Sequence, residues 1–349
     1  MNPKRISRDQ RIDILRILAA SWVVLFHWWA AIWGYPSVFP QSLSQFLKNI
    51  SQFPFGPFYT LSVLGDNAVP LFIAIAAYCL AKKERVGWGW IPDRLRKILF
   101  PYWVAILISF PLLALAWKLN PSLMKLAEVR PLTLEGIIAA ALLLQNSFKA
   151  TFLAPIQAWW FVPILVHLYL IYPLLSRLRS NRSAFRFLTI TILLQLAWNG
   201  LIISRVLATN EIPLLLRFSG PSYLALFAVG MILAEAKRRP SWLTGAIFWF
   251  GGILLRFATN RLFLFSETLI GTGLLLIGLP LAEALIRRTP ILAEKLSILG
   301  KKRSYLIYLL HQPIIYLLLI ALLPLFSKPL ITLLPFLFAI LWLGKNSRW

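Results

Sequence analysis

Charged residues are scarce in this sequence: they make up 14% of its 349 positions, whereas hydrophobic residues make up 59% and the mean hydropathy is +0.73. A water-soluble domain of this length needs many more polar side chains to cover its surface. The shortage of charge therefore excludes an ordinary soluble domain and makes the lipid bilayer the solvent for most of the chain.

Residues that hold metals or form disulfides are equally rare. The only cysteine is Cys79, so no intrachain disulfide can form. The three histidines, His27, His167 and His311, lie in different apolar runs, and no His-x-x-x-His, Glu-x-x-His or cysteine cluster occurs. We therefore expect no metal. Serine-hydrolase and P-loop motifs are also absent.

Basic residues outnumber acidic ones by 36 to 12, which gives a formal net charge of +24. Such an excess can indicate a nucleic-acid partner. Here, however, Lys and Arg cluster in short segments between apolar runs, which is typical of the cytoplasmic loops of membrane proteins. We therefore expect no nucleic-acid partner.

Apolar runs of about 20 residues recur along the chain, the length of helix that crosses a hydrocarbon core of about 30 Å. They are too long and continuous for barrel strands, and helices satisfy the backbone polar groups of each segment internally. The predicted fold class is an all-α integral membrane protein, with both termini cytoplasmic and residues 1–349 forming one transmembrane domain without an appended soluble domain. We predict ten spans, at residues 12–33, 66–81, 98–117, 157–175, 186–204, 217–236, 241–257, 264–286, 305–324 and 329–344.

The run at 134–148 is only about 15 residues long, which is short for a crossing. The next span ends at a cluster of arginines between Arg177 and Arg186, which would lie outside if 134–148 crossed the bilayer. We therefore predict that 134–148 is re-entrant or interfacial. Further basic clusters are expected on the cytoplasmic side, at the N-terminus and in segments 82–97, 237–239 and 287–303.

Span 12–33 carries three ionisable residues, which are costly in a membrane and are therefore candidates for function. The eleven residues from Arg16 to His27 rotate by about 1100°, close to three full turns, so the two side chains share one helix face about 16 Å apart. Asp13 lies three residues before Arg16, where an ion pair can form. An interfacial position explains Asp13 and Arg16 equally well, but it explains His27 poorly.

The other two histidines also lie within apolar runs. Histidine is suited to proton transfer near neutral pH. A hydrogen-bonding structural role is the alternative; it is favoured for His167 and stays open for His311, which follows Tyr308 by three residues.

Five segments resemble the membrane-bound acyltransferase-3 family, whose members acylate sugars and other surface molecules. The segments are RIDILRILAASWVVLFH with its Arg16-x10-His27 spacing, VPLFIAIAAYCLAKK, PDRLRKILFPYW, WWFVPILVHLYLIYPLL and SYLIYLLHQPIIY. The resemblance implies an acyltransferase for groups other than aminoacyl groups. It would move an acyl group, typically acetyl, from cytoplasmic acyl-CoA to a hydroxyl of a saccharide, glycolipid or related envelope molecule, in a bacterial inner membrane.

The resemblance also implies roles for individual residues. His27 would be the catalytic base or a transient acyl carrier, with Arg16 and its neighbour Asp13 as partners in the same helix. Basic residues after the second span would bind the coenzyme A phosphates, although ordinary membrane anchoring explains them too; they are Arg94, Arg96 and Lys97. Residues that could support the site are Tyr78, Trp160, His167, Tyr308 and His311.

Two positions depart from the family pattern. Ala76 and Ala77 stand where the family has Ser-Gly, and Arg94-x-x-Lys97 stands where it has Arg-x-x-Arg. Because the Arg16–His27 pair is retained, we expect an active enzyme. The alternatives are a polysaccharide or lipid-linked-sugar transporter without acyl transfer, and a catalytically silent structural partner. The lack of an internal repeat disfavours transport.

Overall fold

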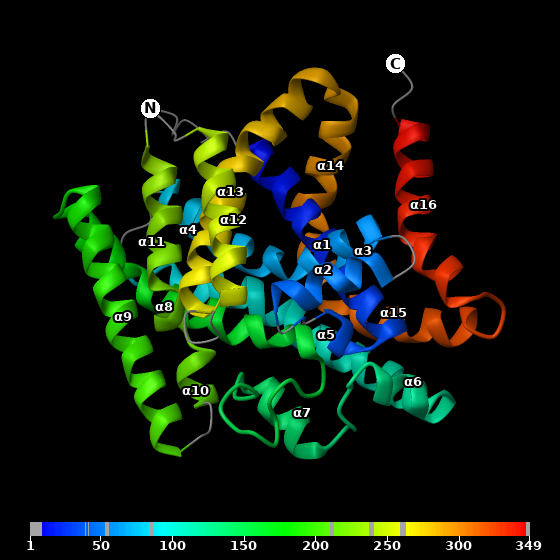
Figure 1. Cartoon of the computed structure of the whole chain (residues 1–349). Coiled ribbons are helices and arrows are strands. Elements are labelled where there is room, and N and C mark those ends of the chain that lie inside the picture. Colours follow the sequence, from blue (N-terminus) through cyan, green and yellow to red (C-terminus); the bar gives the residue numbers. More distant parts are fainter. Residues whose placement is uncertain are drawn as a thin grey trace.

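The computed structural model of the chain describes residues 9–346, except 39, 41, 53–55, 84–86, 210–212, 237–240 and 259–262. Every regular element within these residues is a helix (Figure 1), which confirms the predicted all-α class. Several basic residues that we predicted to be cytoplasmic lie outside the described residues: Lys4, Arg5, Arg8, Arg85, Lys237, Arg238 and Arg239.

Within the described residues, ten apolar helical segments correspond one by one to the ten predicted spans. Seven are long and apolar enough to cross a membrane: Gln10–Trp33, Gly56–Ala81, Ile91–Leu119, Gln157–Ser180, Ala184–Thr209, Phe265–Arg288 and Ser304–Leu322. Three are shorter: Gly220–Glu235, Trp242–Ala258 and Lys328–Ala339. The chain is therefore a multi-pass membrane protein.

The helices that contain these segments are α1 (Gln10–Trp33), α3 (Gly56–Val63), η2 (Leu64–Asn67), α4 (Ala68–Ala81), α5 (Ile91–Leu119), η3 (Gln157–Trp160), α8 (Phe161–Ser180), α9 (Ala184–Thr209), η4 (Gly220–Tyr223), α11 (Leu224–Glu235), α12 (Trp242–Ala258), α13 (Phe263–Arg288), α15 (Ser304–Leu322) and α16 (Lys328–Asn346). The remaining elements are η1 (Tyr35–Val38), α2 (Leu43–Gln52), α6 (Pro121–Leu126), α7 (Leu134–Ala141), α10 (Leu214–Arg217) and α14 (Pro290–Lys302).

Helix α7 occupies the short run at 134–148. The Thr133 side chain caps its first turn by accepting from the N–H of Gly136, and the helix ends after eight residues. Eight residues rise only about 12 Å, so α7 does not cross a bilayer. This agrees with the prediction that the run is re-entrant or interfacial.

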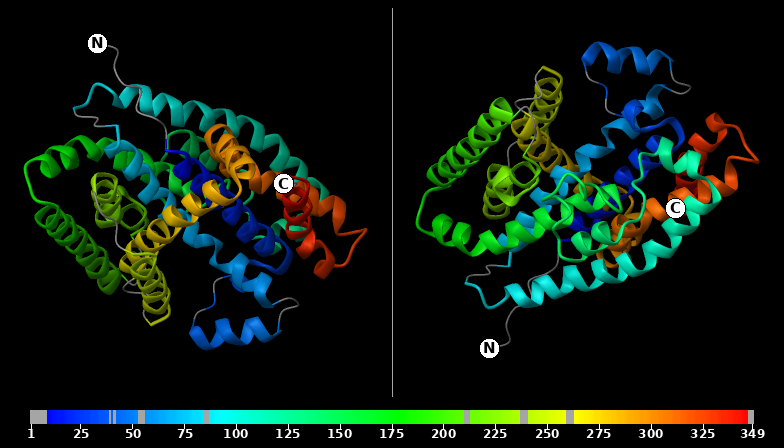
Figure 2. Two further views of the ribbon diagram at one scale, coloured as in Figure 1. Left: turned by 90° about the horizontal axis from the view of Figure 1, so that it is seen from above. Right: turned by 90° about the horizontal axis from the view of Figure 1, so that it is seen from below.

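Helix α1 lies at the centre of the bundle, where it packs against α4, α13, α14 and α15. In its most apolar 18-residue stretch 67% of the residues are buried, against 28% for α9 and 33% for α5. Figure 2 shows α5 and α9 along the edges of the molecule with α1 in the interior. The outer helices therefore present their apolar side chains to lipid, and the ionisable residues of α1 are enclosed by protein.

Candidate active site

The polar residues of α15 lie on one face of the helix because they recur at intervals of three and four. Tyr308, His311, Gln312 and Tyr316 are all buried there. Across from them lies His27 of α1, and the ring centroids of His27 and His311 are 4.9 Å apart. Only 7% of the surface of His27 and 5% of that of His311 is exposed. Two of the three histidines therefore form a buried pair.

His27 is held by the chain that immediately follows α1. The helix ends at Gly34, whose φ of +89° favours glycine, and the chain then reverses into η1. The reversal places the hydroxyl of Tyr35 2.5 Å from Nδ1 of His27. Burial raises the pKa of Tyr35 well above its ordinary range, so the hydroxyl keeps its proton.

Gln312 contacts the same ring nitrogen of His27. Its Nε2 lies 3.1 Å from Nδ1 of His27, and its Oε1 accepts from the backbone N–H of Ala158 at 2.9 Å. Nε2 of Gln312 also donates to Oε1 of Gln157 at 3.0 Å.

The amide of Gln157 is oriented in turn by donation to the carbonyls of Ala127 and Glu128. The orientation of both amides is thereby fixed.

His311 is held by its own helix. Its Nδ1 lies 2.7 Å from the carbonyl oxygen of Tyr308, while its Nε2 is buried and has no hydrogen-bond partner among the described residues. The two histidines thus differ: Nδ1 of His27 is engaged by side chains of other elements, and Nε2 of His311 is unoccupied.

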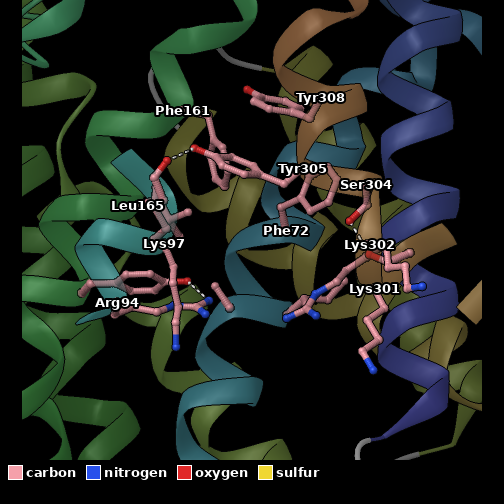
Figure 3. A pocket seen from close by; sticks show the side chains of 16 residues that line it. Phe72, Arg94, Lys97, Phe161, Leu165, Lys301, Lys302, Ser304, Tyr305 and Tyr308 are labelled. Atoms are coloured by element: carbon pink, nitrogen blue, oxygen red, sulfur yellow. Dashed lines mark hydrogen bonds between the residues drawn. The ribbon is translucent and has the colours of Figure 1, made fainter. Parts of the chain in front are cut away.

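A cavity of about 330 Å³ lies on the Arg16 side of this pair (Figure 3). One end is basic and the other is aromatic; the picture shows Lys and Arg side chains in its lower part and Phe161 and Tyr308 in its upper part. The basic residues that line it are Arg16, Arg94, Lys97, Lys301 and Lys302. The aromatic residues that line its other end include Phe72, Phe161 and Tyr308.

The aromatic end of the cavity adjoins the histidines. The ring centroid of Tyr308 lies 5.9 Å from that of Phe72, 5.6 Å from that of Phe161 and 6.0 Å from that of His311. The Tyr308 hydroxyl donates to the carbonyl of Ala158, which fixes the ring. Tyr308 therefore links the lining of the cavity to the ring of His311.

The three predicted phosphate-binding residues of α5 do not lie together. Arg94 and Lys97 line the cavity, and Arg94 donates to the hydroxyl of Tyr169 at 2.8 Å. Arg96 does not line the cavity, because a step of two residues from Arg94 turns the helix by about 200°.

Arg16 belongs to the basic end of the cavity. Its guanidinium pairs with the buried carboxylate of Asp13 at 3.1 Å and donates to Sγ of Cys79 at 3.2 Å. His27 lies three turns further along α1, about 16 Å away along the helix axis. The two residues share a face, as the spacing predicted, but they contact different parts of the site.

Of the predicted supporting residues, the structure places His311 beside His27 and Tyr308 beside His311, and it places the three others elsewhere. Tyr78 donates to a carboxylate oxygen of Asp9, the carbonyl of Trp160 accepts from Asn146, and His167 packs against Gly220. None of these three lines the cavity.

Comparison with known proteins bears on what this arrangement does. A sequence model of the acyltransferase domain Acyl_transf_3 matches residues 9–344. The chain belongs to this family. It is therefore a membrane acyltransferase, one that transfers groups other than aminoacyl groups. No curated protein and no solved structure matches the chain, and no group of three metal-binding side chains occurs within the described residues.

The structure accounts for both alanines that depart from the acyltransferase pattern. Ala76 lines the cavity, so the departure there changes the cavity wall. Ala77 faces α11, where a Cβ added to Gly230 would lie 2.8 Å from the Cβ of Ala77. The glycine on α11 thus leaves the space that the methyl group of Ala77 occupies, and the two helices still approach closely.

Several residues of the candidate site were not predicted as site residues from the sequence. Tyr35 and Gln157 belong to short turns, and no periodic pattern marks them. The polar period of α15 could have indicated Gln312. Lys301 and Lys302 were interpreted only as cytoplasmic anchors, but α14 brings them into the cavity.

Proposed function

We propose that this acyltransferase binds acyl-CoA in the cavity and transfers the acyl group, typically acetyl, to a hydroxyl of a saccharide or related envelope molecule. The observation that carries the proposal is the order of groups along the cavity: basic at one end, aromatic at the other, with two histidines beyond. Coenzyme A has the matching order, with anionic phosphates at one end and a thioester at the other.

The basic end is suited to phosphates. Arginine forms paired hydrogen bonds with phosphate oxygens, and lysine acts as a compact point charge. Five basic side chains from α1, α5 and α14 converge on the cavity, whereas one carboxylate, Asp13, pairs with Arg16. The volume of about 330 Å³ is within the range of small-ligand pockets.

The histidine end is suited to the transfer itself. An alcohol that attacks a thioester needs a group to accept its proton, and a neutral imidazole is suited to that task. His27 is therefore proposed as part of the reacting centre, and Arg16 as a donor-binding residue. With the basic end on the cytoplasmic side, as the positive-inside pattern favours, the acceptor would arrive from the opposite side of a bacterial inner membrane.

Accessible carboxylates at mid-depth would favour the transport alternative. Asp66 is instead paired with Arg256 at 2.6 Å, and Glu267 pairs with the same guanidinium. Membership of an acyltransferase family argues in the same direction.

The test is acetyl-CoA turnover by the purified protein in nanodiscs, measured as release of the free thiol. The wild-type protein should bind acetyl-CoA and hydrolyse it slowly without an acceptor. His27→Ala should bind acetyl-CoA but lose turnover by about 100-fold or more at unchanged thermal stability. Absence of both binding and turnover with acetyl-CoA and longer acyl-CoA donors would contradict the proposal.

A further inference from the structure

The protonation of His311 is determined by its hydrogen bond within α15. Its Nδ1 lies 2.7 Å from the carbonyl oxygen of Tyr308, and a carbonyl can only accept. Nδ1 of the neutral ring therefore carries the proton, and Nε2 carries a lone pair. This Nε2 is buried, since only 5% of the surface of His311 is exposed, and it has no hydrogen-bond partner among the described residues.

A buried acceptor without a donor is unfavourable, and most proteins satisfy such groups. The unoccupied nitrogen of His311 is thus a place where a hydroxyl can bind and lose its proton. It lies beside the ring of His27 and one helical turn beyond Tyr308, which lines the cavity.

The protonation of His27 follows from Gln312. Because Oε1 of Gln312 accepts from Ala158, its Nε2 must be the atom 3.1 Å from Nδ1 of His27. An amide nitrogen only donates, so it would repel a second N–H at that distance. Nδ1 of His27 is therefore the unprotonated nitrogen, which accepts from Tyr35, and Nε2 of His27 carries the proton.

We infer that the two histidines divide the reaction: Nε2 of His311 is the general base for the acceptor hydroxyl, and the Nε2–H of His27 binds the thioester carbonyl oxygen. This inference rests on the proposed function and deepens it. It revises the expectation that His27 is the base or an acyl carrier, because both of those roles need a lone pair at the nitrogen that here carries the proton.

The reaction balances with these two groups. His311 Nε2 takes the proton of the acceptor hydroxyl while its oxygen bonds to the thioester carbon. Negative charge then develops on the carbonyl oxygen, where the N–H of His27 stabilises it. The carbon–sulfur bond breaks, the ester is formed, and the thiolate of coenzyme A takes the proton back from His311. No metal, oxidant or covalent enzyme intermediate is required.

Amide substitutions separate the two roles, since the nitrogen of Asn matches Nδ1 of a histidine and that of Gln matches Nε2. His311→Asn keeps a donor for the Tyr308 carbonyl but removes the lone pair. His27→Gln keeps a donor at the Nε2 position, whereas His27→Asn does not. The probe is acetyl-CoA with the full-length protein in nanodiscs, with water or glycerol as the hydroxyl donor; thiol release, acetyl-CoA binding and thermal unfolding are measured for each variant.

His311→Asn should lose turnover by about 100- to 10,000-fold, the range for a general base, with binding and unfolding temperature unchanged. His27→Gln should retain clearly more turnover than His27→Asn. Wild-type turnover in His311→Asn would overturn the inference, and so would equal loss in the two His27 variants. A wild-type protein that binds acetyl-CoA but transfers to neither hydroxyl would also overturn it. A wild-type protein without binding or turnover would instead refute the proposed function.

Discussion

At the scale of single residues, the position of a charged residue on its helix decides whether its side chain lines the cavity. Arg94 and Lys97 are three residues apart on α5 and line the cavity, whereas Arg96, which lies between them in the sequence, does not line it. The sequence grouped all three because they are adjacent in the chain. Only the direction of each side chain distinguishes a residue that can bind a phosphate from one that can anchor the helix at the membrane surface.

Lys97→Ala should therefore weaken acetyl-CoA binding by about tenfold, because one charge-assisted contact with a phosphate is lost. Arg96→Ala removes the same charge from the same helix and should leave the affinity unchanged. Equilibrium binding of acetyl-CoA to both variants checks this. Equal weakening in the two would mean that net charge, and not the cavity, binds the donor.

The pairing of His27 with His311 could not be predicted from the sequence. Each histidine was identified as a candidate because ionisable groups are costly in apolar runs. Which helices are neighbours in a bundle is decided by packing of side chains far apart in the chain, and hydropathy carries no information on it. The contact of Tyr35 with His27 depends in the same way on the reversal at Gly34.

At the scale of elements, α14 joins the central helix to the basic end of the cavity. The segment 287–303 was expected only to be a basic cytoplasmic cluster, but residues Pro290–Lys302 form a helix that packs against α1. The contact is close at Gly300, where an added Cβ would lie 1.7 Å from the carbonyl oxygen of Asp13. Lys301 and Lys302 follow directly, so this contact positions them beside Arg16.

Gly300→Ala should force α14 away from α1, because the methyl group and the carbonyl oxygen of Asp13 cannot occupy the same space. We expect a lower unfolding temperature and weaker acetyl-CoA binding, since Lys301 and Lys302 move with the helix. Gly200→Ala on α9 is the matched control: nothing lies within 4 Å of its added Cβ, so it should be neutral or slightly stabilising. The unfolding temperature in nanodiscs and the affinity for acetyl-CoA are measured for both variants. An unchanged unfolding temperature and affinity of Gly300→Ala would refute the close contact.

At the scale of the whole molecule, hydropathy was sufficient for the class and for the ten apolar segments, because lipid imposes one requirement on every crossing helix. Hydropathy was insufficient to predict which helices meet at the site in the centre of the bundle. The site combines α1, α4, α5, α8, α14 and α15 with the short helices η1 and η3, and its two histidines come from α1 and α15. The enclosed position of α1 explains why ionisable residues are tolerated along it.

The central claim is that the donor lies along the cavity with its phosphates at the basic end and its acyl group at the histidines. The most direct measurement is photolabelling in nanodiscs with an acyl-CoA analogue that carries a diazirine in its acyl chain, followed by mapping of the labelled peptides. The account predicts label on the segments that contain Phe72, Phe161 and Tyr308, and loss of label with excess coenzyme A. Label confined to the lipid-facing helix α9, or label that coenzyme A does not displace, would contradict it.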